Sequence, residues 1–259
     1  IIERLSTGKR INSAADDPAG LAIATRLTSQ VNGLNQAARN ANNAISMVQI
    51  ADNAADTLDN IFQRMREIVV QAADGSNSAS DIALLNTEFT ALAEETDRLV
   101  DTTSYNGRNI IDGNADESGG SSVTYQVGSN AGIEQTLTID FGDLNLGNGG
   151  LGGDFSSWKT TGLGSNLNTT LTDIDTAISA VATQRATYGA SLNRLEYAVD
   201  NLHSASLTTS IARGRIEDTN YAAETARLAK QQILEQVGTA LLAQANVEAK
   251  SVLKLLDAN

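Results

Sequence analysis

A repeat of apolar residues runs from Val31 to Ala72 without a Pro, and it constrains the fold more than any other feature of the chain. Steps of three and four residues from Val31 reach apolar side chains at every position except Asp52. This heptad spacing predicts a single helix of about 60 Å at about 1.5 Å per residue, which needs an equally long partner. The seam positions are Val31, Leu34, Ala38, Ala41, Ile45, Val48, Asp52, Ala55, Leu58, Phe62, Met65, Val69 and Ala72.

The same spacing recurs between Leu167 and Leu202, where Arg185 is the polar interruption. A shorter copy from Ile82 to Leu99 follows a turn over Gly75–Ser80. Three seams in one chain predict a mainly α fold, a long antiparallel helical bundle or coiled-coil rod.

The two polar seam residues constrain how the long helices align. If the helices are antiparallel and Ala72 lies opposite Leu167, Asp52 falls within one turn of Arg185. We predict an ion pair that sets the register, and the alternative is two independently solvated side chains.

Composition excludes several classes of function. The chain has 18 Lys and Arg against 31 Asp and Glu, and its net charge of −13 repels nucleic acid and anionic membranes. Cys is absent and His203 is the only histidine, so no metal site and no cofactor is expected. No apolar run is long enough for membrane insertion, and no basic-then-apolar leader opens the chain. Because the chain begins at Ile1 rather than Met, a further N-terminal piece is expected.

In the centre of the chain the spacing of apolar residues changes from the helical repeat to a two-residue alternation. Val123, Tyr125 and Val127 alternate with polar residues, as do the residues from Ile133 to Phe141, which predicts a hairpin that turns near residues 128–132. The segment Gly142–Gly164 is rich in Gly, Asn and Ser and is predicted to be a flexible linker. Within it, residues 149–154 match the core of calcium-binding β-helix repeats, but only once, where such folds need several stacked copies.

The two ends of the chain predict one helical arm. Ile1–Arg10 is interpreted as the end of a helix, and turn-favouring residues around Pro18 then break it. A C-terminal helix is predicted from about Tyr221, capped by Asp218-Thr219. Its partner is expected to be the helix that ends at Arg10, together with whatever precedes Ile1. The helix carries an apolar stripe of Leu234, Val237, Leu241, Leu253 and Leu256.

Three segments carry a family resemblance. Residues 3–20, which end in Asp16-Asp17-Pro18-Ala19-Gly20, look like the N-terminal signature of bacterial flagellin, and residues 215–221 and 242–246 look like its C-terminal signatures. The resemblance implies that the paired termini form the inner tube of a filament and that the long helices form a surrounding rod. It also implies that a linker containing Asp16, Asp17, Pro18 and Gly20 joins the two.

The implied domain organisation has five parts. These are residues 1–18, the arm and linker; 19–112, the N-terminal rod helices; 113–164, the hairpin and variable loop; 165–217, the C-terminal rod helix; and 218–259, the C-terminal arm helix.

The resemblance also implies a receptor site. A patch similar to the one that animal flagellin-sensing Toll-like receptors bind comprises Gln63, Arg64, Glu67, Ile68, Gln71 and Glu88. Without the family, Arg64, Glu67 and Gln71 read as a solvated polar helix face. The other partners that the resemblance implies are further copies of the chain, an export chaperone, and the cap and hook-junction proteins.

The function predicted is that of a structural subunit, which polymerises into an extracellular flagellar filament for motility and is exported without a cleaved signal peptide. An alternative from another class is a flagellin-like cell-surface adhesin or polysaccharide-binding protein, although a single Trp offers no evident aromatic platform for sugars. An enzyme is not expected, because Gly142–Gly164 is too short to house one.

Overall fold

The structure, a computed structural model, describes residues 1–147, 149–164 and 166–256, without the side chains of residues 246–256. Its contacts divide the chain into two compact units, one of residues 1–31 and 206–259 and the other of residues 32–205. The domain boundaries expected at residues 18 and 218 therefore fall inside the first unit. The reason is that residues 8–10 pair with residues 217–219, and Arg213 contacts Thr28.

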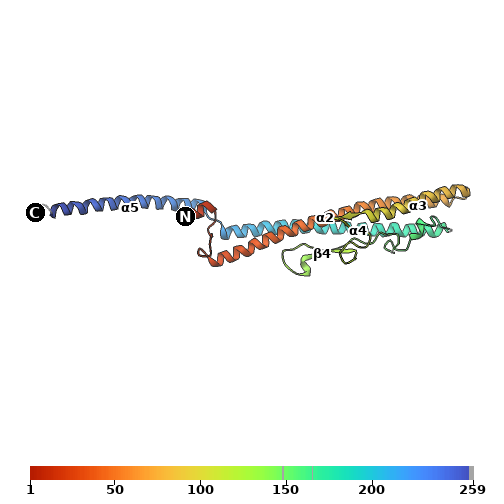
Figure 1. The fold of residues 1–259 in the computed structure, drawn as a ribbon, viewed down its shortest axis with the longest axis horizontal. Helices are drawn as coiled ribbons and strands as arrows, with labels where there is room; N and C mark the ends of the chain where they lie inside the picture. Colours follow the sequence, from red (N-terminus) through yellow and green to blue (C-terminus); the bar gives the residue numbers. More distant parts are fainter. Residues whose placement is uncertain (148, 165, 257–259) are drawn as a thin grey trace. The chain divides into compact units, whose positions relative to one another are not determined.

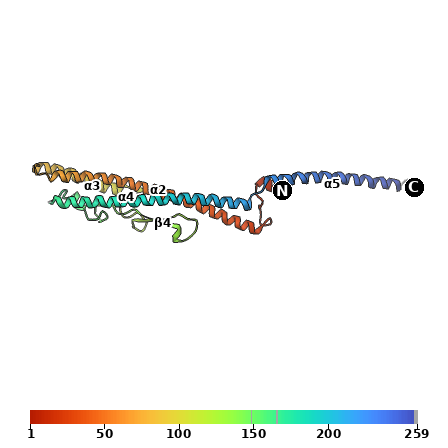
Figure 2. The ribbon, with the colours of Figure 1, turned by 180° about the vertical axis from the view of Figure 1, so that it is seen from behind.

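Three helices supply most of the second unit. They are α2 (Pro18–Ala72), α3 (Ala79–Thr102) and α4 (Leu167–Glu217), and within this unit they lie side by side in Figures 1 and 2. A capping box starts α3, where Ser78 Oγ accepts from the Asp81 N–H and the Asp81 carboxylate accepts from the Ser78 N–H. Among the described residues, no helix has the length and apolar content required to cross a membrane.

The expected seams form the core of this unit, and the antiparallel bundle is confirmed. Seam residues of α2 from Ala41 to Ala72 are buried, apart from Ile45 and Asp52, which are partly buried. The residues that they face on α4 include Ile174, Val181, Tyr188 and Leu195, each 0% exposed. Because many seam residues are Ala, the helices pack closely but each contact buries little apolar area.

Asp52 and Arg185 meet, as the seam alignment predicts. Arg185 Nε lies 3.3 Å from Asp52 Oδ1, and an Arg185 guanidinium NH group lies 2.9 Å from Asp56 Oδ1. A second pair, Arg66 with Asp175 at 2.7 Å, is found in the same alignment farther along the helices. The contact is confirmed, and its role in setting the register remains a prediction.

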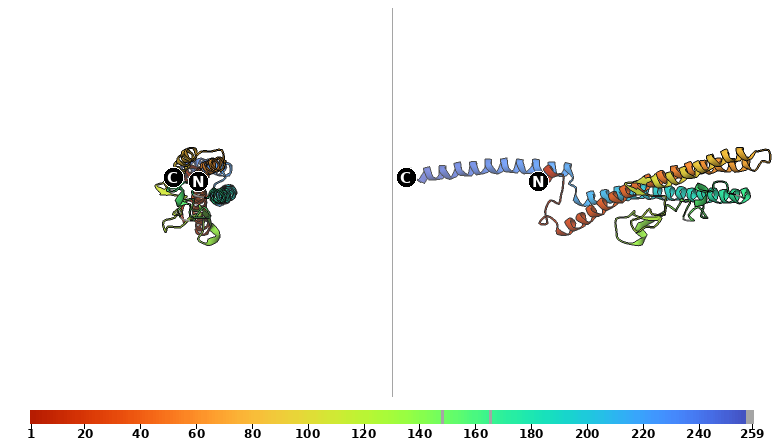
Figure 3. Two further views of the ribbon diagram at one scale, coloured as in Figure 1. Left: turned by 90° about the vertical axis from the view of Figure 1, so that its right-hand side faces the viewer. Right: turned by 45° about the vertical axis from the view of Figure 1, so that its right-hand side comes forward.

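The predicted hairpin is also confirmed. Strands β3 (Ser122–Gln126) and β4 (Thr136–Asp140) pair antiparallel with Val123 opposite Ile139, and the short helix η1 (Ile133–Gln135) precedes β4. The hairpin lies along α2 and α4 (Figure 3). Its Tyr125 hydroxyl donates to the sulfur of Met47 at 2.8 Å, and burial raises the pKa of Tyr125 to about 12.

Gly33 on α2 makes room for the hairpin turn. A Cβ added to Gly33 would lie 2.9 Å from Ser129 Cβ, closer than side chains pack. The helix therefore carries a residue of low helix propensity at the point where the turn approaches it.

The flexible-linker prediction for Gly142–Gly164 is wrong for the described residues. The segment contains the short helix η2 (Ser156–Lys159), and its apolar side chains are buried in the bundle core. Trp158 stacks on Phe155 with ring centroids 4.6 Å apart and meets Phe89 edge-on at 5.8 Å. Asp154 is the acidic residue of the segment that matches calcium-binding β-helix repeats. Its carboxylate accepts a hydrogen bond from the Ser156 N–H at 3.0 Å and so closes a local turn. The buried residues are Leu144, Leu146, Leu151, Phe155, Trp158 and Leu163.

The packed segment predicts the effect of removing its central ring. Trp158→Ala should lower the free energy of unfolding by about 3–5 kcal/mol, because the ring leaves a cavity among Phe62, Phe89 and Phe155. Urea unfolding followed by circular dichroism measures this change. The matched control is Tyr197→Ala, whose ring is 77% exposed. If the two variants lose similar stability, the segment is not part of the core.

The ion pair predicts a measurable coupling between the long helices. A double-mutant cycle of Asp52→Ala and Arg185→Ala should give about 0.2–1 kcal/mol, the range of partly exposed pairs. The cycle belongs in an Asp56→Ala background, because Asp56 otherwise continues to bind Arg185 after Asp52 is removed. Zero coupling would mean that the two side chains are independently solvated.

Candidate assembly and recognition sites

Helix α1 (Ile2–Thr7) opens the first unit and ends earlier than expected. The sequence predicted its end at Arg10, but Gly8 adopts φ 72° and its N–H donates to the Arg4 carbonyl. This left-handed cap stops the helix because the next residues leave the helical path.

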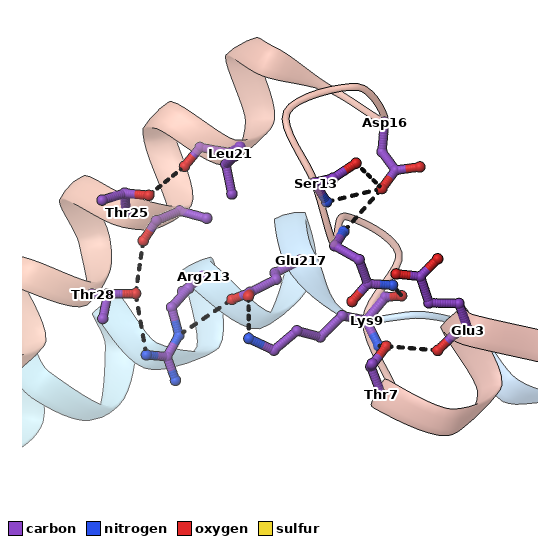
Figure 4. Close-up of polar contacts among 12 residues, drawn as sticks. Glu3, Thr7, Lys9, Ser13, Asp16, Leu21, Thr25, Thr28, Arg213 and Glu217 are labelled. Atoms are coloured by element: carbon purple, nitrogen blue, oxygen red, sulfur yellow. Dashed lines mark hydrogen bonds and ion pairs between the residues drawn. The ribbon is translucent and has the colours of Figure 1, made fainter.

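The linker that follows is an ordered turn organised by Asp16. The Asp16 carboxylate accepts from the backbone N–H of Ser13 at 3.0 Å and of Asn12 at 3.1 Å, and from the Ser13 hydroxyl (Figure 4). These backbone donors, Ser13 first, hold the pKa of Asp16 below its ordinary value. Arg4 lies 3.6 Å from the other carboxylate oxygen. One side chain thus ties α1 to the turn.

The remaining linker residues begin α2. Asp17 caps the helix by accepting from the Gly20 N–H at 2.9 Å, and Pro18 occupies the first helical position, where a missing N–H costs nothing. A Cβ on Gly20 would lie 2.4 Å from Asp17 Oδ2 and 2.6 Å from Ile11 Cδ1. The small residue is needed because the turn closes over it.

The turn region is fastened to the end of α4 by contacts that sequence analysis missed. Arg10 N–H donates to the Glu217 carbonyl at 2.6 Å, and Thr219 N–H donates to the Gly8 carbonyl at 2.9 Å. The Glu217 carboxylate accepts from Lys9 at 2.5 Å and faces Arg213 at 4.0 Å (Figure 4). These contacts join segments that are far apart in the sequence, so no local sequence pattern predicts them. The opposite charges of Lys9 and Glu217 are the one available signal.

Helix α5 (Tyr221–Leu256) starts where predicted but with another cap. Asn220 Oδ1 accepts from the Ala223 N–H at 3.2 Å, in place of the expected Asp218-Thr219 cap. Because α5 begins at Tyr221, Asn220 is the residue in the cap position, while the Asp218 N–H donates to the Gly214 carbonyl of α4 at 2.8 Å. In the first turn Glu224 is 3% exposed and pairs with Arg227 at 3.3 Å.

The apolar stripe of α5 is bare. Leu234 is 57% exposed, Val237 47% and Leu241 64%, and Ile233 beside them is 59% exposed. The side chains of Leu253 and Leu256 lie outside the described residues. The stripe is therefore an apolar helix face that the described chain leaves uncovered.

The expected pairing of the two terminal helices is found between α1 and α5, and among the described residues it does not reach the stripe. Helix α1 lies beside the first turns of α5 (Figure 1), and the Tyr221 hydroxyl donates to the Leu5 carbonyl. The cleft between the two helices is lined on α5 by Leu228, Gln231, Gln232 and Glu235. At about 100° per residue these positions lie on the side of α5 opposite Val237.

Five members of the expected receptor patch lie together on exposed surface. Arg64 donates from α2 to Glu88 of α3 at 2.7 Å and to Glu67 at 2.9 Å, and these carboxylates, Glu88 first, raise the pKa of Arg64. Gln63 and Gln71 are exposed on the same helix. The sixth residue needs correction: Ile68 is 0% exposed, because its seam-side position points it into the core.

Comparisons with known proteins identify the class of this chain. The family model described as the bacterial flagellin N-terminal helical region matches residues 1–116, and that of the C-terminal helical region matches residues 171–256. A flagellin of Halalkalibacterium halodurans is 39% identical, with 98% of this chain and 90% of the relative covered. The flagellar filament 33 kDa core protein of Treponema phagedenis is 38% identical, with 98% and 91% covered.

Solved structures agree with the sequence matches. A crystal structure of Bacillus cereus flagellin is 30% identical with a TM-score of 0.50, covering 63% of this chain and 88% of that one. A putative flagellar hook-associated protein from Vibrio parahaemolyticus, at 17% identity and a TM-score of 0.62, covers 78% of this chain and 100% of its own, and shares the fold.

The chain belongs to the bacterial flagellin family. Its function is that of a structural subunit, which self-assembles into the extracellular bacterial flagellar filament for motility. The resemblance predicted from the terminal signatures is confirmed. No comparison favours the adhesin alternative.

Proposed function

We propose that the bare stripe of α5 is the surface through which copies of this subunit polymerise. Four large apolar side chains, Ile233, Leu234, Val237 and Leu241, lie on one helix face and are each at least 47% exposed. An exposed apolar face of this kind seeks a partner, and in a homopolymer the partner is another copy. The position of α1 on the opposite side of α5 supports this, because the described N-terminal residues leave the stripe uncovered.

Ordering and assembly are coupled in this proposal. From Ala229 to Ala245, every residue of α5 is exposed except Gly238, so this part of the helix gains little packing from the described residues. Helices without packing are marginal in water, and neighbouring copies supply the missing burial. The arm is then mobile in the monomer and helical in the filament.

Three finer proposals rest on family resemblance alone. The subunit binds an export chaperone, it contacts the cap and hook-junction proteins, and it is exported without a cleaved signal peptide. The absence of enzymatic activity rests on the structural nature of the family. For the adhesin alternative, the one Trp that could stack on a sugar is 3% exposed and already stacked on Phe155.

We also propose that Gln63, Arg64, Glu67, Gln71 and Glu88 form a contact surface for a host flagellin-sensing Toll-like receptor. The carboxylates of Glu67 and Glu88 hold the Arg64 guanidinium across α2 and α3, so the charged head is presented in a fixed position. Val70, which is 51% exposed on the same stretch of α2, adds an apolar neighbour. Arginine is among the residues enriched at interface hot spots.

The polymerisation proposal predicts the effect of one buried charge. Val237→Glu should slow seeded filament growth at least ~10-fold, because the carboxylate would be buried without a partner between copies. Thr239→Glu adds the same charge about 200° around the helix and is the matched control. Truncation after Asp218 should abolish growth yet leave the second unit folded by circular dichroism. Normal seeded growth of the truncated chain would exclude α5 as the polymerisation surface.

The receptor proposal predicts a selective loss of affinity. Arg64→Ala should weaken binding of a Toll-like receptor ectodomain at least ~10-fold in surface plasmon resonance, as expected for a central hot spot. Arg98→Ala is the control, since Arg98 is an exposed arginine paired with Glu95 on the neighbouring helix. Equal effects of both variants, or none, would reject the patch.

A further inference from the structure

A two-residue turn follows α3 and carries an Asn-Gly sequence. Strands β1 (Ser104–Tyr105) and β2 (Arg108–Asn109) pair with Tyr105 opposite Arg108, which leaves Asn106 and Gly107 as the turn. Asn106 has φ 52° and Gly107 φ 79°. Positive φ at both central residues is typical of a type I′ turn, for which Asn-Gly is a preferred sequence.

The turn itself is exposed, and the residues that flank it are held by a backbone hydrogen bond and a buried side chain. Asn106 and Gly107 are both exposed, and a Cβ on Gly107 would meet nothing within 4 Å. On either side of the turn, Ile110 N–H donates to the Thr103 carbonyl at 3.2 Å, and the Ile110 side chain is 0% exposed. Because each strand has only two residues, the turn can open locally while the core stays closed.

We propose that Asn106-Gly107 is a site of spontaneous deamidation and backbone isomerisation. The Gly107 backbone nitrogen, after losing its proton, attacks Cγ of Asn106, and the side-chain amide leaves as ammonia, which closes a succinimide ring. Water then opens the ring at Cγ to give aspartate, or at the main-chain carbonyl carbon to give isoaspartate. Gly107 favours the attack because it has no Cβ to hinder the nitrogen, and water and hydroxide are the only reagents.

A second Asn-Gly dipeptide, Asn32-Gly33, allows the reactivity of the same sequence to be compared in two structural settings. These residues lie inside α2, where the Gly33 nitrogen is held in helical geometry, and Gly33 is covered by Ser129. A helix keeps the backbone nitrogen away from the preceding side-chain carbon and must open before the ring can form. The same dipeptide therefore differs in reactivity for structural reasons alone. The third such dipeptide, at 148–149, lies partly outside the described residues.

Both products change the turn. Aspartate adds a negative charge to a chain that already carries −13. Isoaspartate inserts an extra carbon into the main chain, which a two-residue type I′ turn cannot accommodate, so the β1–β2 pairing is lost. The neighbouring Ile110 anchor confines the change to this corner of the second unit.

The test is peptide mapping of the full-length folded protein after incubation at neutral and mildly alkaline pH, with mass spectrometry and isoaspartate detection. Conversion at Asn106 should exceed that at Asn32 at least ~10-fold, which corresponds to only ~1.4 kcal/mol of difference in opening free energy. Conversion should rise with pH, because the attacking nitrogen must lose its proton. In urea the two sites should react at similar rates.

Asn106→Gly is the matched variant. Gly-Gly also suits a type I′ turn, so the fold is kept while the reacting amide is removed, and product at this peptide should disappear. The proposal is overturned if native Asn106 reacts no faster than native Asn32, or if Asn106 reacts only when the whole protein is unfolded.

Discussion

The antiparallel contact between α2 and α4 is the constraint on which the second unit depends. Alanines such as Ala41 and Ala55 allow the two backbones to approach closely, and the larger Phe62 and Tyr188 fill the spaces between them. Alanine seams are easily shifted, because one Ala resembles the next. We therefore expect the alignment to rely on irregular features, which here are the Arg185 ion pairs, whose role in the register is a prediction, and the large rings.

Sequence patterns could predict most of the fold because they are local. Heptad spacing located α2, α3 and α4, and alternation located β3 and β4. Sequence patterns failed at Gly142–Gly164, where Leu144, Phe155 and Trp158 pack without any regular spacing. The composition of this segment therefore indicated a linker. A segment of irregular backbone can still contribute to a core if each apolar side chain finds a separate gap and side chains such as Asp154 cap its turns.

The candidate sites were predictable to a lesser degree. Motif resemblance indicated the Asp16–Gly20 turn and the residues of the proposed receptor patch, but it included the buried Ile68 because a motif does not distinguish the two faces of a helix. The contacts of Lys9 and Arg10 with Glu217 join residues more than two hundred positions apart, and no local pattern encodes such pairing. The cap at Asn220 was missed because three consecutive residues, Asp218, Thr219 and Asn220, are all good caps.

Burial is distributed unevenly between the units, and this distribution connects the fold with its function. In the second unit even the Gly-rich segment is used to enclose apolar surface, and the rings around Trp158 complete the core. In the first unit, polar contacts around Asp16 and Glu217 fix the turn, while α5 leaves Leu234 and Val237 in water. In the proposed assembly through α5, a chain that buried those side chains within one subunit would lose this driving force for polymerisation. On this proposal, the filament supplies the packing that α5 lacks in the described chain.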